Sequence, residues 1–174
     1  MIPKRVMIIG GPGSGKSTLA TRMGAALGLP VYHMDREVFW LPGWQERAKD
    51  DQRRQIERIV ALDAWVFEGN NSSSFSLREA RADMLVWLDV PLWLRLVRVI
   101  RRSVRQNGQT RADMARDCPE RLSMLPDFLW FILSTARSGR RTQSAFFDAT
   151  GLMRYRLRSV SEVEAFVAGL GRCT

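Results

Sequence analysis

The sequence predicts an α/β fold of three layers, in which a parallel sheet lies between two layers of helices. Short apolar segments of strand length alternate along the chain with segments whose apolar residues recur at helical spacing. This alternation is typical of strand–helix–strand units with right-handed crossovers, whose parallel strands are covered on both faces. A glycine-rich loop joins the first strand to the first helix. The 174 residues, 45% hydrophobic and 26% charged, are expected to form a single domain spanning 1–174.

The glycine-rich loop is Gly10-Gly-Pro-Gly-Ser-Gly-Lys16-Ser17, which fits the phosphate-binding pattern G-x-x-x-x-G-K-[ST]. It allows backbone N–H groups to surround an anion, and the N-terminus of the following helix adds partial positive charge. Lys16 is expected to reach the β- and γ-phosphates of a nucleoside triphosphate, and the Ser17 hydroxyl to ligate Mg²⁺. The residues expected to bind the nucleotide are Gly11, Gly13, Ser14, Gly15, Lys16, Ser17 and Thr18.

Local signals place the remaining elements. Short apolar runs predict the strands, in chain order 5–9, 31–33, 64–67, 84–88 and 152–157. Apolar stripes predict the helices, in chain order 18–27, 46–62, 75–81, 91–106, 120–138 and 161–170. Gly28-Leu-Pro30 ends the first helix, and Pro91 begins the fourth. Pro126 is expected to kink or split the fifth helix. Ser161 and Glu164 are expected to form a capping box at the start of the last one.

Three carboxylates follow predicted strands, at the sheet edge where ligands bind in open α/β folds. Asp35 is placed to orient an acceptor hydroxyl and take its proton, and a turn or N-cap aspartate is the alternative. Glu68 is the leading candidate to assist Mg²⁺ together with Ser17, and the alternative is that Glu68 is an ordinary residue at the end of a strand. Asp89 is its rival for the metal, although we interpret Asp89 as structural. We interpret His33, the only histidine, as a packed strand residue.

Arginine dominates the net charge of +9, because only three of the 27 basic residues are lysines. The guanidinium group suits bidentate recognition of phosphate. Arg98 and Arg102 stand four residues apart and hence on one face of the fourth helix, where they form either a phosphate clamp or a solvated face. Residues 107–121 interrupt the helical pattern. They are expected to be a lid that brings Arg111 to the phosphates and excludes water, and a plain surface connection is the alternative.

The aromatic segment 39–44 is expected either to stack on a flat acceptor or to staple this loop to the body of the protein. The two cysteines, Cys118 and Cys173, make neither a disulfide framework nor a metal quartet, so a cytoplasmic location is expected. No apolar run reaches the length of a membrane span. The basic charge permits nucleic-acid binding, but no helix-turn-helix pattern, zinc finger or basic tail supports it.

In the same order along most of the chain, these motifs resemble those of the topology-modulation (FlaR-type) proteins, a branch of the adenylate-kinase-like P-loop NTPases. The resemblance rests on the strings Gly10 to Thr18, His33-Met-Asp35, Phe39-Trp40, Pro42-Gly43-Trp44, Trp65-Val-Phe-Glu-Gly-Asn70, Leu77-Arg78, Leu88-Asp-Val-Pro91, Arg98, Arg101-Arg102, Thr110-Arg111 and Cys118-Pro-Glu-Arg121.

The resemblance implies a five-stranded sheet in the order 2-3-1-4-5, ATP on the phosphate loop, and a helical lid after the fourth strand. It also implies that Arg98 and Arg102 contact the nucleotide and the transferred phosphoryl group. The chain departs from the family at Glu68-Gly-Asn-Asn71, where the usual pattern is Asp-Gly-Asn-Tyr. Acceptor recognition at this position is therefore not carried over from the family.

The function expected from these observations is that of a small kinase-like phosphotransferase, which moves the γ-phosphoryl group of ATP·Mg²⁺ to a small acceptor. Its expected catalytic residues are Lys16, Asp35, Arg98, Arg102 and Arg111. The alternative is an ATP-dependent regulatory protein that acts on DNA or its machinery. That function requires arginines clustered on a surface away from the nucleotide cleft.

Overall fold

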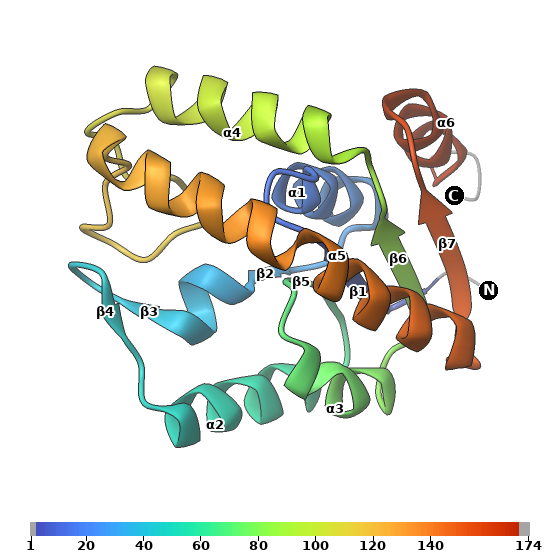
Figure 1. Ribbon diagram of the computed structural model, residues 1–174. Coiled ribbons are helices and arrows are strands. Elements are labelled where there is room, and N and C mark those ends of the chain that lie inside the picture. The colour runs from blue at the N-terminus through green and yellow to red at the C-terminus, as the bar shows by residue number, and fades with distance from the viewer. Residues whose placement is uncertain (1–2, 171–174) are drawn as a thin grey trace.

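A five-stranded parallel sheet, in the spatial order β2-β5-β1-β6-β7, forms the centre of the computed structural model, which describes residues 3–170 (Figure 1). Its strands are β1 (Arg5–Gly10), β2 (Val31–His33), β5 (Trp65–Glu68), β6 (Met84–Leu88) and β7 (Met153–Leu157). Numbered along the chain without the small separate hairpin β3–β4, this is the expected order 2-3-1-4-5. The prediction of the fold class is confirmed.

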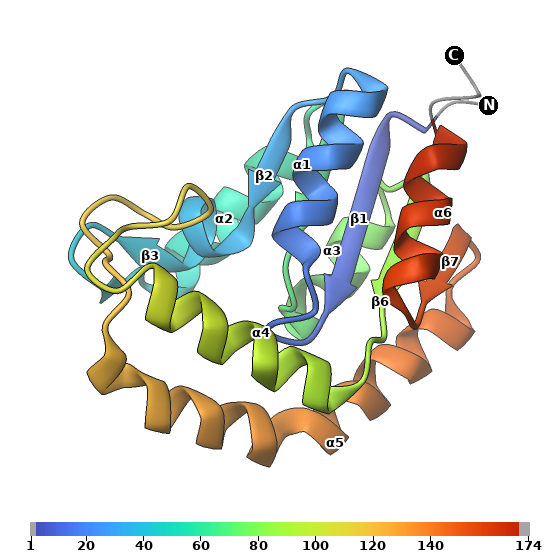
Figure 2. The same cartoon turned by 90° about the horizontal axis from the view of Figure 1, so that it is seen from above.

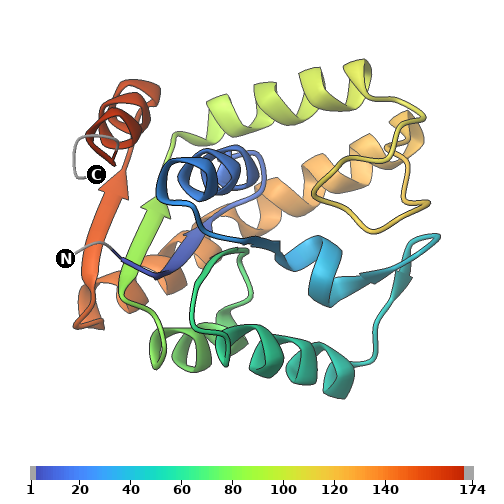
Figure 3. The ribbon, with the colours of Figure 1, turned by 180° about the vertical axis from the view of Figure 1, so that it is seen from behind.

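Helices cover both faces of the sheet (Figures 2 and 3). Side chains alternate between the two faces along β1, so Val6 and Ile8 face one layer while Met7 and Ile9 face the other. The first layer consists of α1 (Lys16–Leu27) and α6 (Val160–Leu170). The second consists of α2 (Lys49–Val60), α3 (Phe75–Glu79) and the C-terminal half of α5 (Leu125–Ala149).

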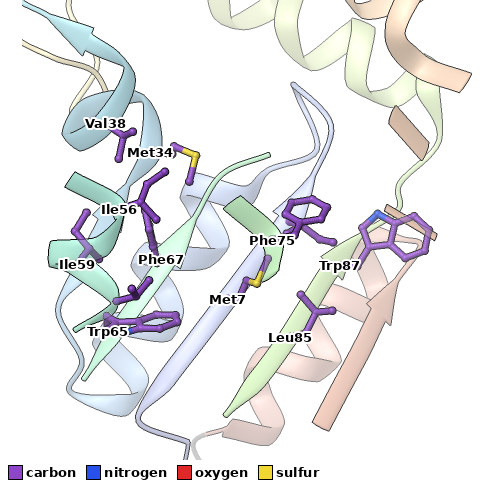
Figure 4. Close-up of a cluster of buried hydrophobic side chains, with 12 residues drawn as sticks. Met7, Met34, Val38, Ile56, Ile59, Trp65, Phe67, Phe75, Leu85 and Trp87 are labelled. Atoms are coloured by element: carbon purple, nitrogen blue, oxygen red, sulfur yellow. The ribbon is translucent and has the colours of Figure 1, made fainter. Parts of the chain in front are cut away.

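The second layer contains the larger apolar cluster, in which Trp65, Phe67 and Trp87 are fully buried (Figure 4). The ring edge of Trp65 meets Phe67, with 6.2 Å between centroids. Burial of a large apolar side chain stabilises a fold by about 1.5–3 kcal/mol. This cluster therefore anchors the strands β5, β1 and β6, whose carboxyl ends form the edge at which the candidate site lies.

At that edge, α4 (Leu92–Arg105) and the N-terminal half of α5 lie beyond the ends of the strands (Figure 2). The segment 107–121 connects the two helices. The break in the helical pattern was expected, but the helical lid implied by the resemblance is not observed: the segment consists of turns held by isolated bridges between Asn107 and Glu120 and between Thr110 and Pro119.

The aromatic segment 39–44 is also more ordered than expected. A short π-helical turn, η1 (Asp35–Phe39), leads into an antiparallel hairpin of β3 (Trp40–Leu41) and β4 (Gln45–Glu46).

Three of the expected helix boundaries were wrong, since α5 also continues to Ala149, well beyond its expected end at residue 138. Pro126 neither kinks nor splits a helix, because α5 begins at Leu125 after the 3₁₀ turn η3 (Leu122–Met124) and the proline lies in its first turn. In the first turn a backbone N–H has no acceptor within the helix, so a proline, which lacks this N–H, loses no hydrogen bond there. The last helix is capped by Ser159, whose Oγ accepts a hydrogen bond from the N–H of Glu162 at 3.1 Å. Glu164 does not belong to a capping box with Ser161, since it pairs with Arg22 of α1.

None of the helices within residues 3–170 is both long enough and apolar enough to span a membrane.

Candidate functional site

The phosphate loop lies between β1 and α1, as the sequence predicts. Gly15 adopts a left-handed conformation, with φ of 96°, immediately before the first residue of α1. The loop also packs closely on α4, because a Cβ atom at Gly13 would lie 2.5 Å from the carbonyl oxygen of Arg95. The Lys16 Nζ donates a hydrogen bond to the Gly11 carbonyl at 3.3 Å, so its ammonium group lies across the loop. The expected nucleotide-binding residues, 11 and 13–18, are thus brought together in one loop and helix start.

Glu68 and Ser17 meet beside this loop. Ser17 Oγ donates to Glu68 Oε1 at 3.1 Å, and His33 Nδ1 lies 2.9 Å from the same oxygen. The parallel register sets His33 of β2 directly beside Glu68 of β5. An ionised carboxylate only accepts hydrogen bonds, so the contact assigns a proton to Nδ1 of His33. His33 is buried as expected, and it also orients the carboxylate that sequence analysis assigned to the metal.

Asp35 begins the π-helical turn that follows β2. Burial raises the pKa of its carboxyl group above the ordinary value, and the nearby charge of Glu68 raises it further. The positive charges of Lys16 and Arg111 act in the opposite direction. These charges reach Asp35 from three different elements, which places its carboxylate between the phosphate loop and the 107–121 segment. A carboxylate whose pKa is raised is a stronger proton acceptor than an ordinary one.

Three arginines of α4 contact the phosphate loop, line the cavity, or do both. Arg95 Nε donates to the Pro12 carbonyl at 2.8 Å, and Arg98 donates to the Ser14 carbonyl at 2.9 Å. Arg98 therefore lies against the phosphate loop, whereas Arg102, one turn further on, lines the cavity at the site. Arg95 lines this cavity as well, although sequence analysis did not single it out.

Arg102 and Arg111 meet at Glu120. Their Nε atoms lie 3.1 Å and 3.0 Å from Glu120 Oε1, and Ser103 Oγ donates to the other carboxylate oxygen at 3.2 Å. Burial lowers the pKa of Arg102, the charge of Arg111 lowers it further, and Glu120 opposes both. Glu120 thus holds together two arginines that would otherwise repel each other. Sequence analysis noted Cys-Pro-Glu-Arg only as a string typical of a family and missed this role.

Asp113 is a second acidic residue that sequence analysis missed. It pairs with Arg111 at 3.1 Å. Burial alone would raise the pKa of Asp113, but the charge of Arg111 and the hydroxyl of Ser17 outweigh burial and lower it. Asp113 thus places a second carboxylate of the 107–121 segment beside Arg111.

The hairpin β3–β4 and the 107–121 segment pack on each other, and we call the two together the roof (Figure 3). The N–H of Trp44 donates to Cys118 Sγ at 3.2 Å, and its indole N–H donates to the Pro119 carbonyl at 3.2 Å. The rings of Trp40 and Trp44 meet edge to face, 5.2 Å apart, and both pack against Cys118 and its neighbours. The two tryptophans therefore hold the loop to the body of the protein, as one alternative expected, and both also line the cavity. Stacking on an acceptor remains a prediction.

A cavity of about 1560 Å³ lies under the roof. Its lining includes Lys16 of the phosphate loop, Asp35, Arg102 and Arg111. Pockets for one small ligand typically measure about 300–1,000 Å³. The cavity is thus large enough for a nucleotide and a second small molecule.

Asp89 also lines the cavity, but Arg140 and Arg156 hold its carboxylate at 2.8 Å and 2.6 Å. Burial alone would raise the pKa of Asp89, yet the hydrogen bonds from these two arginines lower it. Its carboxylate is therefore occupied, in accordance with the structural interpretation.

Solved structures of small-molecule kinases share this arrangement of elements. The shikimate kinase of Bacteroides thetaiotaomicron is 15% identical, with a TM-score of 0.56, and the match covers 98% of both chains. A shikimate kinase of Acinetobacter baumannii, in complex with shikimate, has the same identity and TM-score over 98% of this chain and 92% of that one. A gluconokinase of Sinorhizobium meliloti 1021 is 16% identical, with a TM-score of 0.53, over 99% and 95%.

The chain has a P-loop kinase fold. No protein-family model and no curated protein sequence matches it. Identities of 15–16% establish the fold, and the function is argued below from the site itself.

Proposed function

We propose that the protein is a cytoplasmic, ATP-dependent kinase that transfers the γ-phosphoryl group of Mg·ATP to a hydroxyl group of a small acceptor. The observation that supports this most strongly is the half-buried Asp35 carboxylate, with its raised pKa, in the same cavity as the phosphate loop and Lys16. A protein that only binds ATP needs the loop but has no use for a proton acceptor facing it.

The phosphate loop and Lys16 hold the triphosphate in this proposal. Ser17 Oγ and Glu68 Oε1, 3.1 Å apart, offer the oxygen ligands that magnesium prefers, so these residues fit the ion. Among the described residues no group of three or more histidine, cysteine or acidic side chains is arranged to hold a metal, which leaves further ligands to phosphate and water. Magnesium, when bound, neutralises charge on the β- and γ-phosphates.

The remaining residues act on the acceptor and on the charge that moves. Asp35 orients the acceptor hydroxyl and takes its proton. Arg102 and Arg111, which both pair with Glu120, neutralise the negative charge of the phosphoryl group during transfer. Arg98 stabilises the phosphate loop through its hydrogen bond to the Ser14 carbonyl. The roof is the lid of this proposal. It excludes water, which would otherwise compete with the acceptor for the phosphoryl group.

The resemblance to topology-modulation proteins remains part of the proposal as the closer family. The alternative that the chain acts on DNA requires arginines gathered away from the cleft. Arg102, Arg111 and Arg137 instead line the cavity, so we favour the kinase.

The test is a phosphotransfer screen with γ-labelled ATP across shikimate, gluconate, sugars, nucleosides and nucleoside monophosphates. We expect transfer to one class, lowered about 10²- to 10⁴-fold in Asp35→Asn while ATP still binds. Lys16→Ala should lose ATP uptake. Asp50→Asn, the same change on an exposed turn of α2, is the matched control and should be fully active. Full activity of Asp35→Asn, or ATP uptake with no transfer to any class, would refute the proposal.

A further inference from the structure

Asn70 follows β5 and lines the cavity. Its position depends on Gly69, which has φ of +148° and where a Cβ atom would lie only 2.4 Å from Met34 Cβ. The fully buried Arg78 donates to the Gly69 carbonyl at 3.0 Å and so holds this backbone in place. These contacts therefore fix the backbone between β5 and the cavity. Asn70 is the first residue after this turn whose side chain a ligand in the cavity would meet.

The orientation of the Asn70 amide follows from a chain of hydrogen bonds that begins in the core. The indole N–H of Trp87 only donates, and it donates to Gln143 Oε1 at 2.9 Å. Trp87 is fully buried and Gln143 is 5% exposed, so Gln143 has its oxygen toward the core and its amide nitrogen toward Asn70. That nitrogen donates to Asn70 Oδ1 at 2.8 Å. Because Gln143 fixes the Asn70 oxygen on its own side, the side of the amide that points away from Gln143 is the NH₂ group, which only donates.

The wall beside Asn70 has positive charge. It is formed by α5, whose exposed residues Arg137, Arg140 and Arg141 line the cavity within the two turns before Gln143. No acidic residue occurs between positions 128 and 147 of this helix. Arg140 is neutralised by Asp89, whereas within residues 3–170 no carboxylate lies within ion-pair distance of Arg137 or Arg141. A donor amide beside unpaired guanidinium groups selects oxygen atoms with negative charge.

We propose that Asn70 is a specificity residue, and that the acceptor carries an anionic oxygen group, either a carboxylate or a phosphate, which accepts a hydrogen bond from Asn70 Nδ2. The acceptor is then a hydroxyl compound with one end at Asp35 and its anionic end at Asn70 and the α5 wall. This inference rests on the proposed function for the identity of the hydroxyl end, and on the Trp87–Gln143–Asn70 chain for the anionic end.

The decisive variant is Asn70→Asp, in which a carboxylate oxygen replaces the donating amide nitrogen while the oxygen that accepts from Gln143 remains. Asn71→Asp is the matched control, because it adds the same charge one residue away and keeps the oxygen that accepts from the Ser73 N–H at 3.1 Å. A second variant, Asn70→Ala, removes the donor without adding charge. Thermal unfolding of all three variants tests whether each is folded.

Binding is measured by calorimetry in the presence of Mg²⁺ and a saturating non-hydrolysable ATP analogue. The probes are paired as gluconate with glucose, shikimate with its methyl ester, and AMP with adenosine. We expect the wild type to bind the anionic member of at least one pair at least about tenfold more tightly than the neutral member. Asn70→Asp should weaken that binding about 10- to 100-fold, Asn70→Ala should weaken it less, and Asn71→Asp should leave it within about threefold.

The comparison of gluconate and shikimate with AMP also distinguishes carboxylate from phosphate. Equal binding of both members in every pair, binding of no anionic probe, or tight anion binding by Asn70→Asp would each overturn the assignment. Selective anion binding that depends on Asn70, without phosphoryl transfer in the screen above, would refute the proposed kinase and leave this inference standing.

Discussion

Glu120→Gln is the substitution whose effect the structure defines most closely. It removes the single negative charge that lies between Arg102 and Arg111, while glutamine has the same length and still offers one carbonyl oxygen. The side chains involved are largely buried, with 11% of Glu120, 24% of Arg102 and 15% of Arg111 exposed. The two guanidinium groups then face each other with no carboxylate between them, and only Asp113 still pairs with Arg111. We expect the 107–121 segment to detach from α4.

The magnitude follows from the two contacts. Both contacts are ion pairs, and removing one partner of a buried ion pair costs about 3–5 kcal/mol. The partial exposure of both arginines and the retained carbonyl reduce the loss, so we expect about 3 kcal/mol. For a chain of this size that loss corresponds to roughly 6–12 °C in the midpoint of thermal unfolding.

The assay combines thermal unfolding with hydrogen exchange of the backbone. Protection should fall in residues 107–121 and in the hairpin that packs on them, while β1 and β6 stay protected. Glu164→Gln is the matched control, because its partner Arg22 is on the surface, and its unfolding midpoint should equal that of the wild type. A wild-type midpoint for Glu120→Gln, or loss of protection in β1 instead of 107–121, would refute the account of Glu120.

Three further changes test other parts of the structure. Burial lowers the pKa of Arg78 from its ordinary value to about 9, so the folded state binds fewer protons than the unfolded state in the pH range between these two values. The difference in unfolding free energy between the wild type and Arg78→Met should therefore increase as the pH is raised through 9. Urea unfolding at pH 7 and pH 10 measures this difference, and an equal difference at the two pH values would contradict the account. Gly69→Ala should cost about 1–3 kcal/mol, because its Cβ would overlap Met34, and an unchanged urea midpoint would count against the close contact. Ser159→Ala should cost about 1 kcal/mol in the same assay and Ser161→Ala clearly less, with the reverse order pointing back to the cap expected from sequence.

Sequence analysis was most successful where the signal is local. The phosphate loop could be located because its glycines, Lys16 and Ser17 stand at set positions within eight residues. The strands were found because buried parallel strands are short apolar runs. The helix boundaries at Pro126 and Ser161 were predicted wrongly, because a proline is accepted in a first turn and a serine two positions away can cap the same helix.

The arginines of α4 show why roles are harder to predict than positions. The spacing of Arg98 and Arg102 correctly implies one helix face, yet Arg98 contacts the loop while Arg102 contacts Glu120. This difference arises because α4 crosses the edge of the sheet, so successive turns meet different neighbours. The assigned catalytic roles of both residues remain predictions, which the phosphotransfer screen can be extended to test.

The order of elements, the sheet and the place of the phosphate loop could all be derived from residues a few positions apart, because apolar periodicity and glycine conformations act locally. The polarity of the cavity depended on the tertiary structure. Trp87 and Gln143 are 56 positions apart and Gln143 and Asn70 are 73 apart, and no pattern in the chain records their contact. Packing of α5 on the sheet alone decides which face of the Asn70 amide a ligand meets, just as packing of the 107–121 segment decides that Glu120 joins Arg102 to Arg111.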